Sequence, residues 1–126
     1  MAWSCGDQER LLPFFAEDAR YQDVGSDLTF NGHAEIARFY RFMLRFAPDS
    51  EIRFDSAYGD RNGFAARWTW TGTAAGPLRV GEELVPPTGR PFSVPGVAFC
   101  TLTSDGILAS HEDYYDMHAV VRHLTS

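Results

Sequence analysis

Residues 107–116 read ILASHEDYYD, a run that begins apolar and ends with three carboxylates, one imidazole and two phenols. The Ser-Asp-Gly turn signal before it predicts a strand that starts with the apolar residues and continues into the polar ones. Because strand side chains alternate between faces, His111, Asp113 and Tyr115 share one face, opposite Glu112. If the first face lines a cavity, this polar strand is a functional site.

The composition is that of a single globular domain spanning residues 1–126. The chain is 44% hydrophobic, and no linker or charge run divides it. A net charge of −6 with only 11 Lys and Arg argues against nucleic acid and against an anionic membrane as partner. The start lacks a signal-peptide pattern, and no apolar run is long enough to span a bilayer, so we expect a cytoplasmic protein.

The cysteines and histidines predict neither a disulfide nor a metal site. Cys5 and Cys100 are far apart without a CxxC motif, which favours two free thiols, neither of them catalytic. His118 and His123 are five apart, so they lie on different faces of a helix. HExxH, GxSxG and phosphate-binding glycine motifs do not occur, and we expect no cofactor.

Hydrophobic periodicity predicts an α+β fold. Apolar residues recur at helical spacing in 33–46, where we assign the stripe to the core. Turn signals between the later strands predict an antiparallel meander. We expect helices over 7–15, 33–46 and 117–124, and strands over 19–24, 50–58, 64–72, 92–103 and from 107 onward.

The Gly/Pro-rich connection over 73–91 is too long for a tight turn. Its central segment, 78–85, could pair as an edge strand. The connection could also act as a lid.

Strand parity suggests which side chains meet in the interior. Arg67 and Thr69 share a face, and we place them inward, where Arg67 would pair with Asp23 or Asp113 because an enclosed charge needs a partner. Trp68 and Trp70 then face outward on an uncovered sheet, which predicts a homodimer through that face.

Two carboxylates near an arginine, a histidine and several tyrosines could divide the work of proton transfer, one staying ionised while a drier neighbour keeps its proton. Each residue also has a structural alternative. Arg67 with Asp23 could be an ion pair only, and His111 a hydrogen-bonded core histidine. Asp116 immediately precedes an apolar helical run, so we assign it to the N-cap and not to catalysis.

From about residue 3 to residue 124 the sequence resembles the nuclear transport factor two-like superfamily. FFAEDARYQDVGS (14–26) and NGHAEIARFY (31–40) resemble ketosteroid isomerases, in which the acid corresponding to Asp23 is the proton-moving base. PPTGRPFSVPGVAF (86–99) and SDGILASHEDYYDMHAVVRHL (104–124) resemble SnoaL-like polyketide cyclases. In that group a pocket acid and a histidine catalyse an intramolecular aldol closure, and Asp113 and His111 are the nearest matches.

The sequence departs from both other related enzyme patterns. Limonene epoxide hydrolases are similar at Tyr21, Asp23, Arg67 and Asp113, but Thr69 stands where they need a second carboxylate, which disfavours epoxide hydrolysis. The oxyanion acid of the isomerases would fall near Ala98. Family members carry an extra helical stretch before residue 3, so we expect a shortened N-terminal helix.

The resemblance implies a cone-shaped, curved, mixed or antiparallel sheet of the cystatin-like class, wrapped by N-terminal helices, with a short C-terminal helix. Phe39, Met43 and Trp3 would contact its concave face, and Asp23 and Asp113 would open into one pocket.

It also implies a cofactor-free isomerase or aldol cyclase, a lyase-type enzyme acting on a small hydrophobic oxygenated substrate. Asp113 would be the general acid/base, and His111 and Asp23 would orient or share the proton. The expected substrate-binding residues are Tyr21, Arg67, Thr69, Tyr115 and Tyr40. The alternative is a non-catalytic module that binds a small molecule or dimerises.

Overall fold

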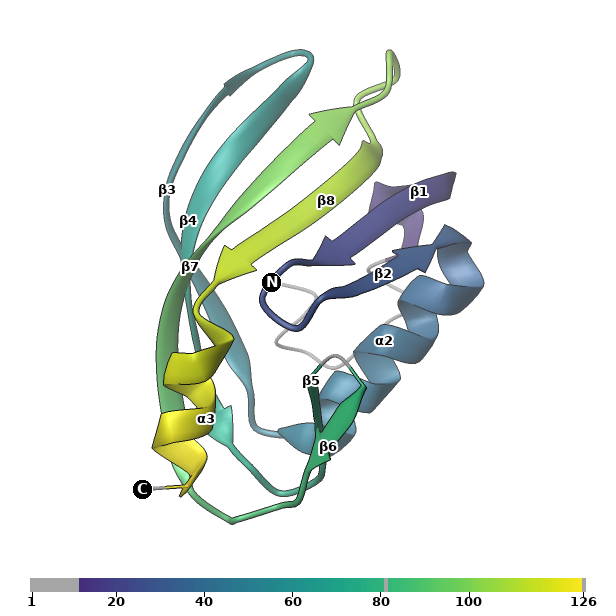
Figure 1. Ribbon diagram of the computed structural model, residues 1–126. Helices are drawn as coiled ribbons and strands as arrows, with labels where there is room; N and C mark the ends of the chain where they lie inside the picture. Colours follow the sequence, from purple (N-terminus) through teal and green to yellow (C-terminus); the bar gives the residue numbers. More distant parts are fainter. Residues whose placement is uncertain (1–11, 81, 126) are drawn as a thin grey trace.

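A computed structural model of the chain describes residues 12–80 and 82–125. Within them, a curved six-stranded sheet, a two-stranded hairpin and two α-helices surround one apolar core (Figure 1). The elements are η1 (Leu12–Phe14), β1 (Phe15–Asp23), β2 (Leu28–Asn31), α2 (Gly32–Phe46), β3 (Glu51–Asp60), β4 (Gly63–Thr73), β5 (Leu78–Val80), β6 (Glu83–Val85), β7 (Pro91–Leu102), β8 (Leu108–Tyr115) and α3 (Met117–Thr125). No helix in this part of the chain is long and apolar enough to cross a bilayer.

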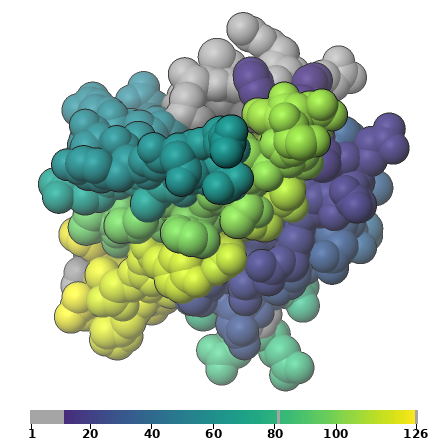
Figure 2. All heavy atoms as spheres, turned by 90° about the horizontal axis from the view of Figure 1, so that it is seen from above, coloured from purple at the N-terminus to yellow at the C-terminus, as the bar shows by residue number. Residues whose placement is uncertain are grey.

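The six-stranded sheet has the order β2-β1-β8-β7-β4-β3. The space-filling view shows these strands following one another across the surface, from teal β3 and β4 to purple β1 (Figure 2). All neighbours are antiparallel except β1 and β8, which run parallel with Tyr21 opposite His111 and Asp23 opposite Asp113. This register sets two carboxylates side by side on adjacent strands.

Helix α2 lies against β1 and β2, and α3 packs on β7 (Figure 1). Glu35 in the first turn of α2 accepts a hydrogen bond from the Asn31 backbone N–H at 3.0 Å, which satisfies one donor at the helix start. The apolar side chains of both helices join the inner face of the sheet in one cluster. The buried helix residues are Ile36, Ala37, Phe39, Tyr40, Met43, Phe46, Met117, Val120 and Leu124.

The structure confirms the α+β class and the cone-shaped sheet. The predicted helices over 33–46 and 117–124 appear as α2 and α3, and all five predicted strands are present. The segment 78–85 forms a separate hairpin, β5–β6, instead of an edge strand of the main sheet. Short strand β2 was not predicted.

The expected helix over 7–15 is only partly testable. Leu12–Phe14 forms a single 3-10 turn, and Phe15 already belongs to β1. The rest of that segment, together with Trp3 and Cys5, lies outside the described residues.

The predicted parity of β4 is wrong. Trp68 and Trp70 are buried on the inner face, whereas Arg67 is exposed on the outer face with Thr69 beside it. The prediction placed Arg67 inward and gave it Asp23 or Asp113 as the partner that an enclosed arginine needs. Neutral donors and one histidine satisfy those carboxylates instead, so the two large apolar rings take the interior and the guanidinium stays in water.

The close approach of Trp68 to β7 depends on Gly96. A Cβ atom at this position would lie 2.4 Å from the Trp68 indole, inside any real contact distance. Only glycine therefore lets the indole lie across β7 at this point.

We expect Gly96→Ala to lower the free energy of unfolding by about 1–3 kcal/mol, because the Trp68 ring must leave its place in a packed core. Urea unfolding followed by tryptophan fluorescence measures the change. Ser93→Ala, at an exposed position of the same strand, is the matched control and should change little. Equal stability of Gly96→Ala and wild type would contradict the packing argument.

Candidate active site

Asp113 on β8 is a buried carboxylate that accepts hydrogen bonds from three side chains. The Tyr21 hydroxyl donates to Oδ2, the Trp68 indole Nε1 donates to Oδ1 at 3.2 Å, and His111 Nε2 lies 2.8 Å from Oδ1. Three donors hold the carboxylate in one orientation. Asp113 is therefore a rigidly held hydrogen-bond acceptor inside the cone.

His111 supplies the matching positive charge. Burial lowers the pKa of this imidazole, but the charge of Asp113 and the hydrogen bond to it outweigh burial and raise the pKa to about 10. As an imidazolium it donates through both nitrogens, to Asp113 and to the Cys100 sulfur, which lies 3.4 Å from Nδ1. Its ring stacks on Tyr21, with centroids 4.5 Å apart and planes 8° from parallel.

Asp23, the neighbour of Asp113 across the parallel strand pair, behaves differently. Burial raises the pKa of Asp23 to about 6. The hydrogen bond from Tyr115 lowers this pKa, whereas the nearby charge of Asp113 raises it further. Tyr115 donates to Oδ2 at 3.0 Å, and the Ser26 backbone N–H donates to Oδ1 at 3.2 Å. Asp23 can therefore gain or lose a proton near neutral pH.

The turn after β1 has a sequence suited to this arrangement. A Cβ atom at Gly25 would lie 2.6 Å from the Tyr115 ring, so glycine gives the ring room to reach Asp23. Asp27 adopts a positive φ of 61°, which aspartate tolerates better than most residues. The Val24 N–H donates to the Asp113 carbonyl at 2.9 Å and fixes the turn to β8.

Three phenols surround the two carboxylates. Burial raises the pKa of Tyr21, Tyr40 and Tyr115 well above 10, and the charges of Asp113 and Asp23 add to it. All three phenols are therefore neutral, and Tyr21 and Tyr115 donate hydrogen bonds to Asp113 and Asp23. The Tyr40 ring packs edge-on against Tyr21 with centroids 5.8 Å apart.

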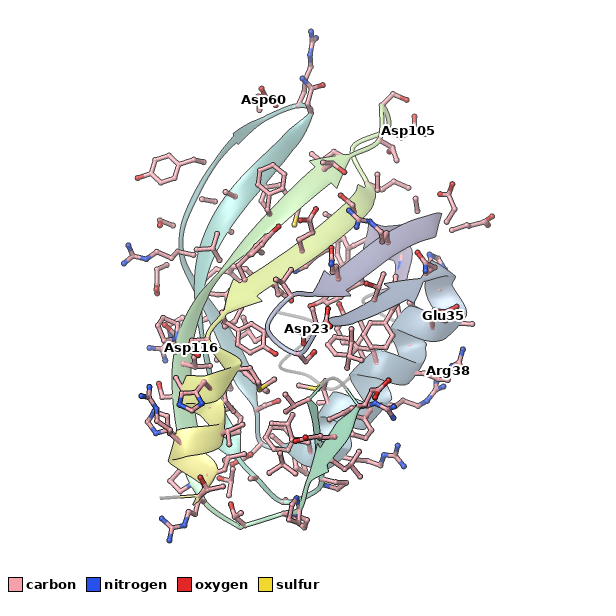
Figure 3. The ribbon with its side chains drawn as sticks, viewed as in Figure 1. Asp23, Glu35, Arg38, Asp60, Asp105 and Asp116 are labelled. Carbon is pink, nitrogen blue, oxygen red and sulfur yellow. The ribbon has the colours of Figure 1, made fainter. Side chains whose placement is uncertain are left out.

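Two cavities adjoin the carboxylates. The larger, about 970 Å³, lies between the β1–β2 turn, α2, β5 and the start of α3, and the smaller, about 20 Å³, lies within the cone. Asp23, Phe39 and Met43 line both. In Figure 3, Asp23 lies at the centre of the molecule, facing the interior between its strand and α2. Asp23 and Asp113 thus open into one small cavity, as predicted, and Phe39 and Met43 also line it.

The large cavity has a mixed charged lining. Its cations are Arg38, Arg41, Arg45 and Arg79, and its anions are Asp23 and Glu35. Glu35 and Arg38 lie along α2, the helix that forms one wall (Figure 3).

The structure brings together six of the eight predicted site residues: Asp23, Asp113, His111, Tyr21, Tyr40 and Tyr115. Arg67 and Thr69 are excluded from this group because they face outward. Asp116 caps α3 as expected, accepting from the Ala119 N–H at 3.2 Å.

Sequence reasoning missed Trp68, Trp70, Ser26 and the contact of Cys100 with His111. The alternation of β4 allows either set of side chains to face the interior. Placing the tryptophan set inward would have identified the two indoles as site residues. No group of three or more His, Cys, Asp or Glu residues in the described ranges is placed to hold a metal ion.

The raised pKa of Asp23 makes stability depend on pH. The folded protein keeps this proton up to about pH 6, whereas the unfolded chain loses it near 3.8. Between these values the folded state binds more protons, so the free energy of unfolding falls as pH rises. Roughly two pKa units, each worth about 1.4 kcal/mol, give a total of about 3 kcal/mol.

We expect Asp23→Asn to remove most of this fall between pH 4 and 7 in urea unfolding experiments. Asp55→Asn, an exposed aspartate on β3, is the matched control and should leave the pH profile unchanged. If the free energy of unfolding depends on pH in the same way in wild type and in Asp23→Asn, the raised pKa of Asp23 is contradicted.

Comparison with known proteins identifies the domain family and the fold. The SnoaL-like domain profile matches residues 1–111. The fold is similar to that of a candidate SnoaL-like polyketide cyclase from Jannaschia sp. CCS1, with a TM-score of 0.82 and 21% identity, covering 96% of this chain and 80% of the other.

Two further solved structures share the fold. TsrD from Streptomyces laurentii has a TM-score of 0.82 and 23% identity, with 98% of this chain and 87% of the other covered. A hypothetical protein from Catenulispora acidiphila DSM 44928 with a ketosteroid isomerase-like fold, solved in complex with trimethylamine, has a TM-score of 0.81 and 20% identity, with 98% and 85% covered. No curated protein matches the chain in sequence. Because the domain profile covers most of its length, the chain belongs to the SnoaL-like domain family.

Proposed function

We propose that this protein is a cofactor-independent cyclase or isomerase that transfers protons on a small, largely apolar, oxygenated substrate. The observation that carries the proposal is Asp23, a buried carboxylate with a pKa of about 6 that lines the large cavity. General acid/base catalysis works best with a group whose pKa lies near the working pH. A concave cavity that combines apolar side chains with polar groups is the usual setting of a small-molecule site.

The hydrogen bonds favour Asp23 over Asp113 as the acid/base. Asp113 is engaged by three donors and paired with the His111 imidazolium, so protonating it would sacrifice the ion pair. The Asp23 side chain accepts hydrogen bonds from neutral groups, the Tyr115 hydroxyl and the Ser26 backbone N–H, and its pKa of about 6 lies near neutral pH. We therefore move the proton-transfer role, which the sequence analysis assigned to Asp113, to Asp23, and we assign Asp113 and His111 to orientation and charge balance.

In this mechanism the Asp23 carboxylate takes a proton from a carbon next to a carbonyl group, and the bonding electrons of that C–H bond move into the enolate. An isomerase returns the proton to a different carbon. A cyclase uses the enolate carbon to attack a second carbonyl of the same molecule, and the resulting alkoxide takes the proton back from Asp23. Tyr115, which donates to Asp23, keeps the carboxylate oriented in both cases.

A binding module without catalysis is the second candidate. The observation in its favour is that the interior polar groups around Asp113 satisfy one another without any ligand. Such a network can serve stability alone. The cavity would then hold a ligand with no proton transfer.

Assembly is a further part of the proposal. With the tryptophans inside, the outer face of β7 and β8 exposes the apolar side chains of Val97, Phe99 and Tyr114, which are 38%, 51% and 46% exposed. Val97 pairs directly with Tyr114 across β7 and β8, so these groups form a contiguous patch. Apolar patches of this kind mark interfaces, and we keep the homodimer with this patch in place of Trp68 and Trp70.

The acid–base assignment predicts different effects for the two aspartates. With 2-tetralone as probe, whose C–H bonds beside the carbonyl are acidic, wild-type protein should accelerate deuterium uptake in D₂O. Asp23→Asn should reduce this rate by a factor of ~10² to 10⁴ while the fold survives, because only the proton acceptor is lost.

Asp113→Asn should instead act mainly on the fold, by about 3–5 kcal/mol, because it leaves the buried His111 cation without its partner. NMR for exchange and urea unfolding for stability separate the two effects. The binding module would be favoured if wild-type protein binds 2-tetralone and a panel of β-dicarbonyl compounds but does not accelerate their deuterium uptake above the rate without protein.

The dimer proposal is tested by placing a charge in the outer patch. Wild type should sediment at about twice the mass of the 14.1 kDa chain, and Phe99→Asp should sediment as a monomer. Leu84→Asp, at an exposed position of β6, is the control and should leave the mass unchanged. Analytical ultracentrifugation that shows a wild-type monomer at micromolar concentration would rule the interface out.

A further inference from the structure

One buried hydrogen-bond donor in the cone has no partner. Among the described residues, the buried side-chain polar atoms without a hydrogen bond are Ser50 Oγ and Trp70 Nε1. Buried N–H groups in folded proteins are almost always bonded, so an unbonded one needs an explanation such as a missing water or ligand. An indole nitrogen only donates, and the missing partner must therefore be an acceptor.

Trp70 lines the small cavity together with Asp23, Asp113 and Tyr115. The other donors of this cavity wall already have partners: Tyr115 donates to Asp23, and Trp68 and Tyr21 donate to Asp113. The Trp70 indole is thus the donor in this wall that is left for a ligand.

The size of the cavity limits what can enter it. A volume of about 20 Å³ accepts one water-sized group and excludes a ring or an alkyl chain. Since Asp23, Phe39 and Met43 also line the large cavity, a ligand bound there needs to extend only one polar atom past them.

We propose that the cavity of about 20 Å³ is a subsite for the carbonyl oxygen of the substrate, with the Trp70 indole N–H as its hydrogen-bond donor. This inference rests on the proposed function, because it names the group that receives the charge during proton transfer.

Charge movement explains why a carbonyl oxygen fits beside two carboxylates. When Asp23 takes the proton it becomes neutral, and the negative charge passes to the enolate oxygen. The number of negative charges around the cavity stays the same during this step. A fixed donor placed where charge develops stabilises the transition state more than the bound ketone.

The test compares 2-naphthol, the stable aromatic counterpart of the 2-tetralone enol, with naphthalene, which lacks the oxygen. We expect wild-type protein to bind 2-naphthol more tightly than naphthalene. Trp70→Phe should weaken 2-naphthol binding roughly tenfold and leave naphthalene binding nearly unchanged, since only the hydrogen bond is lost.

A second variant guards against a change of packing. Replacing Trp70 by benzothienylalanine keeps the bicyclic shape and substitutes sulfur for the N–H group. It should show the same selective loss of 2-naphthol binding, with an unchanged near-ultraviolet circular dichroism spectrum. If 2-naphthol binds no better than naphthalene, or if the benzothienylalanine protein binds both as wild type does, the proposal is overturned.

A crystal structure with 2-naphthol distinguishes the ligand oxygen from water. Its oxygen within hydrogen-bond distance of Trp70 Nε1 supports the subsite, whereas a water retained there, with the naphthol oxygen elsewhere, overturns it. Deuterium exchange tests the acid–base role of Asp23 separately from the Trp70 subsite. If Asp23→Asn exchanges 2-tetralone as fast as wild type while Trp70 still controls 2-naphthol binding, the acid–base role fails and the subsite stands.

Discussion

The parallel pairing of β1 with β8 is the constraint on which the interior depends. It sets Asp23 beside Asp113, both on the concave face of the sheet and both shielded from water. Two carboxylates so placed cannot both be ionised without compensation, because burial and mutual repulsion each disfavour the charged form. The surrounding residues resolve this conflict in two different ways.

Asp113 is compensated by a cation and by hydrogen bonds, and Asp23 by its ability to protonate. The Asp113 ion pair with His111 is also supported by Tyr21 and Trp68. Asp23 receives two weaker bonds, from Tyr115 and Ser26, and its pKa stays near 6. Similar chemical groups on neighbouring strands thus acquire different properties from their environments, which is how paired carboxylates divide acid and base roles.

The alternation of β8 could be predicted from the sequence because the polar run leaves little choice. His111, Asp113 and Tyr115 share a face by parity, and a turn signal fixes where the strand starts. Helix α2 was predictable for a similar reason, since its apolar stripe has only one periodicity.

Strand β4 was not predictable in the same way. Its two faces carry either two indoles or one guanidinium with two threonines, and each has a rationale for facing inward. The outcome depends on whether the carboxylates find donors elsewhere, which is a property of β1, β7 and β8 together. Long-range pairing of this kind, and with it the position of Trp68 and Trp70 beside the carboxylates, lies beyond what periodicity in one strand can show.

The ionisation states also set the electrostatic character of the site. Among the described residues that line the small cavity, the carboxylates are Asp23 and Asp113, and Asp113 contacts the His111 imidazolium. The pKa of Asp23 is about 6, so this side chain adds a negative charge to the cavity above that pH. A substrate that arrives neutral and leaves neutral does not change this balance, whereas a permanently anionic group placed beside Asp23 would have to meet repulsion at neutral pH. For the proposed substrate, this repulsion favours an uncharged group next to Asp23 and any anionic part toward the arginines that line the large cavity.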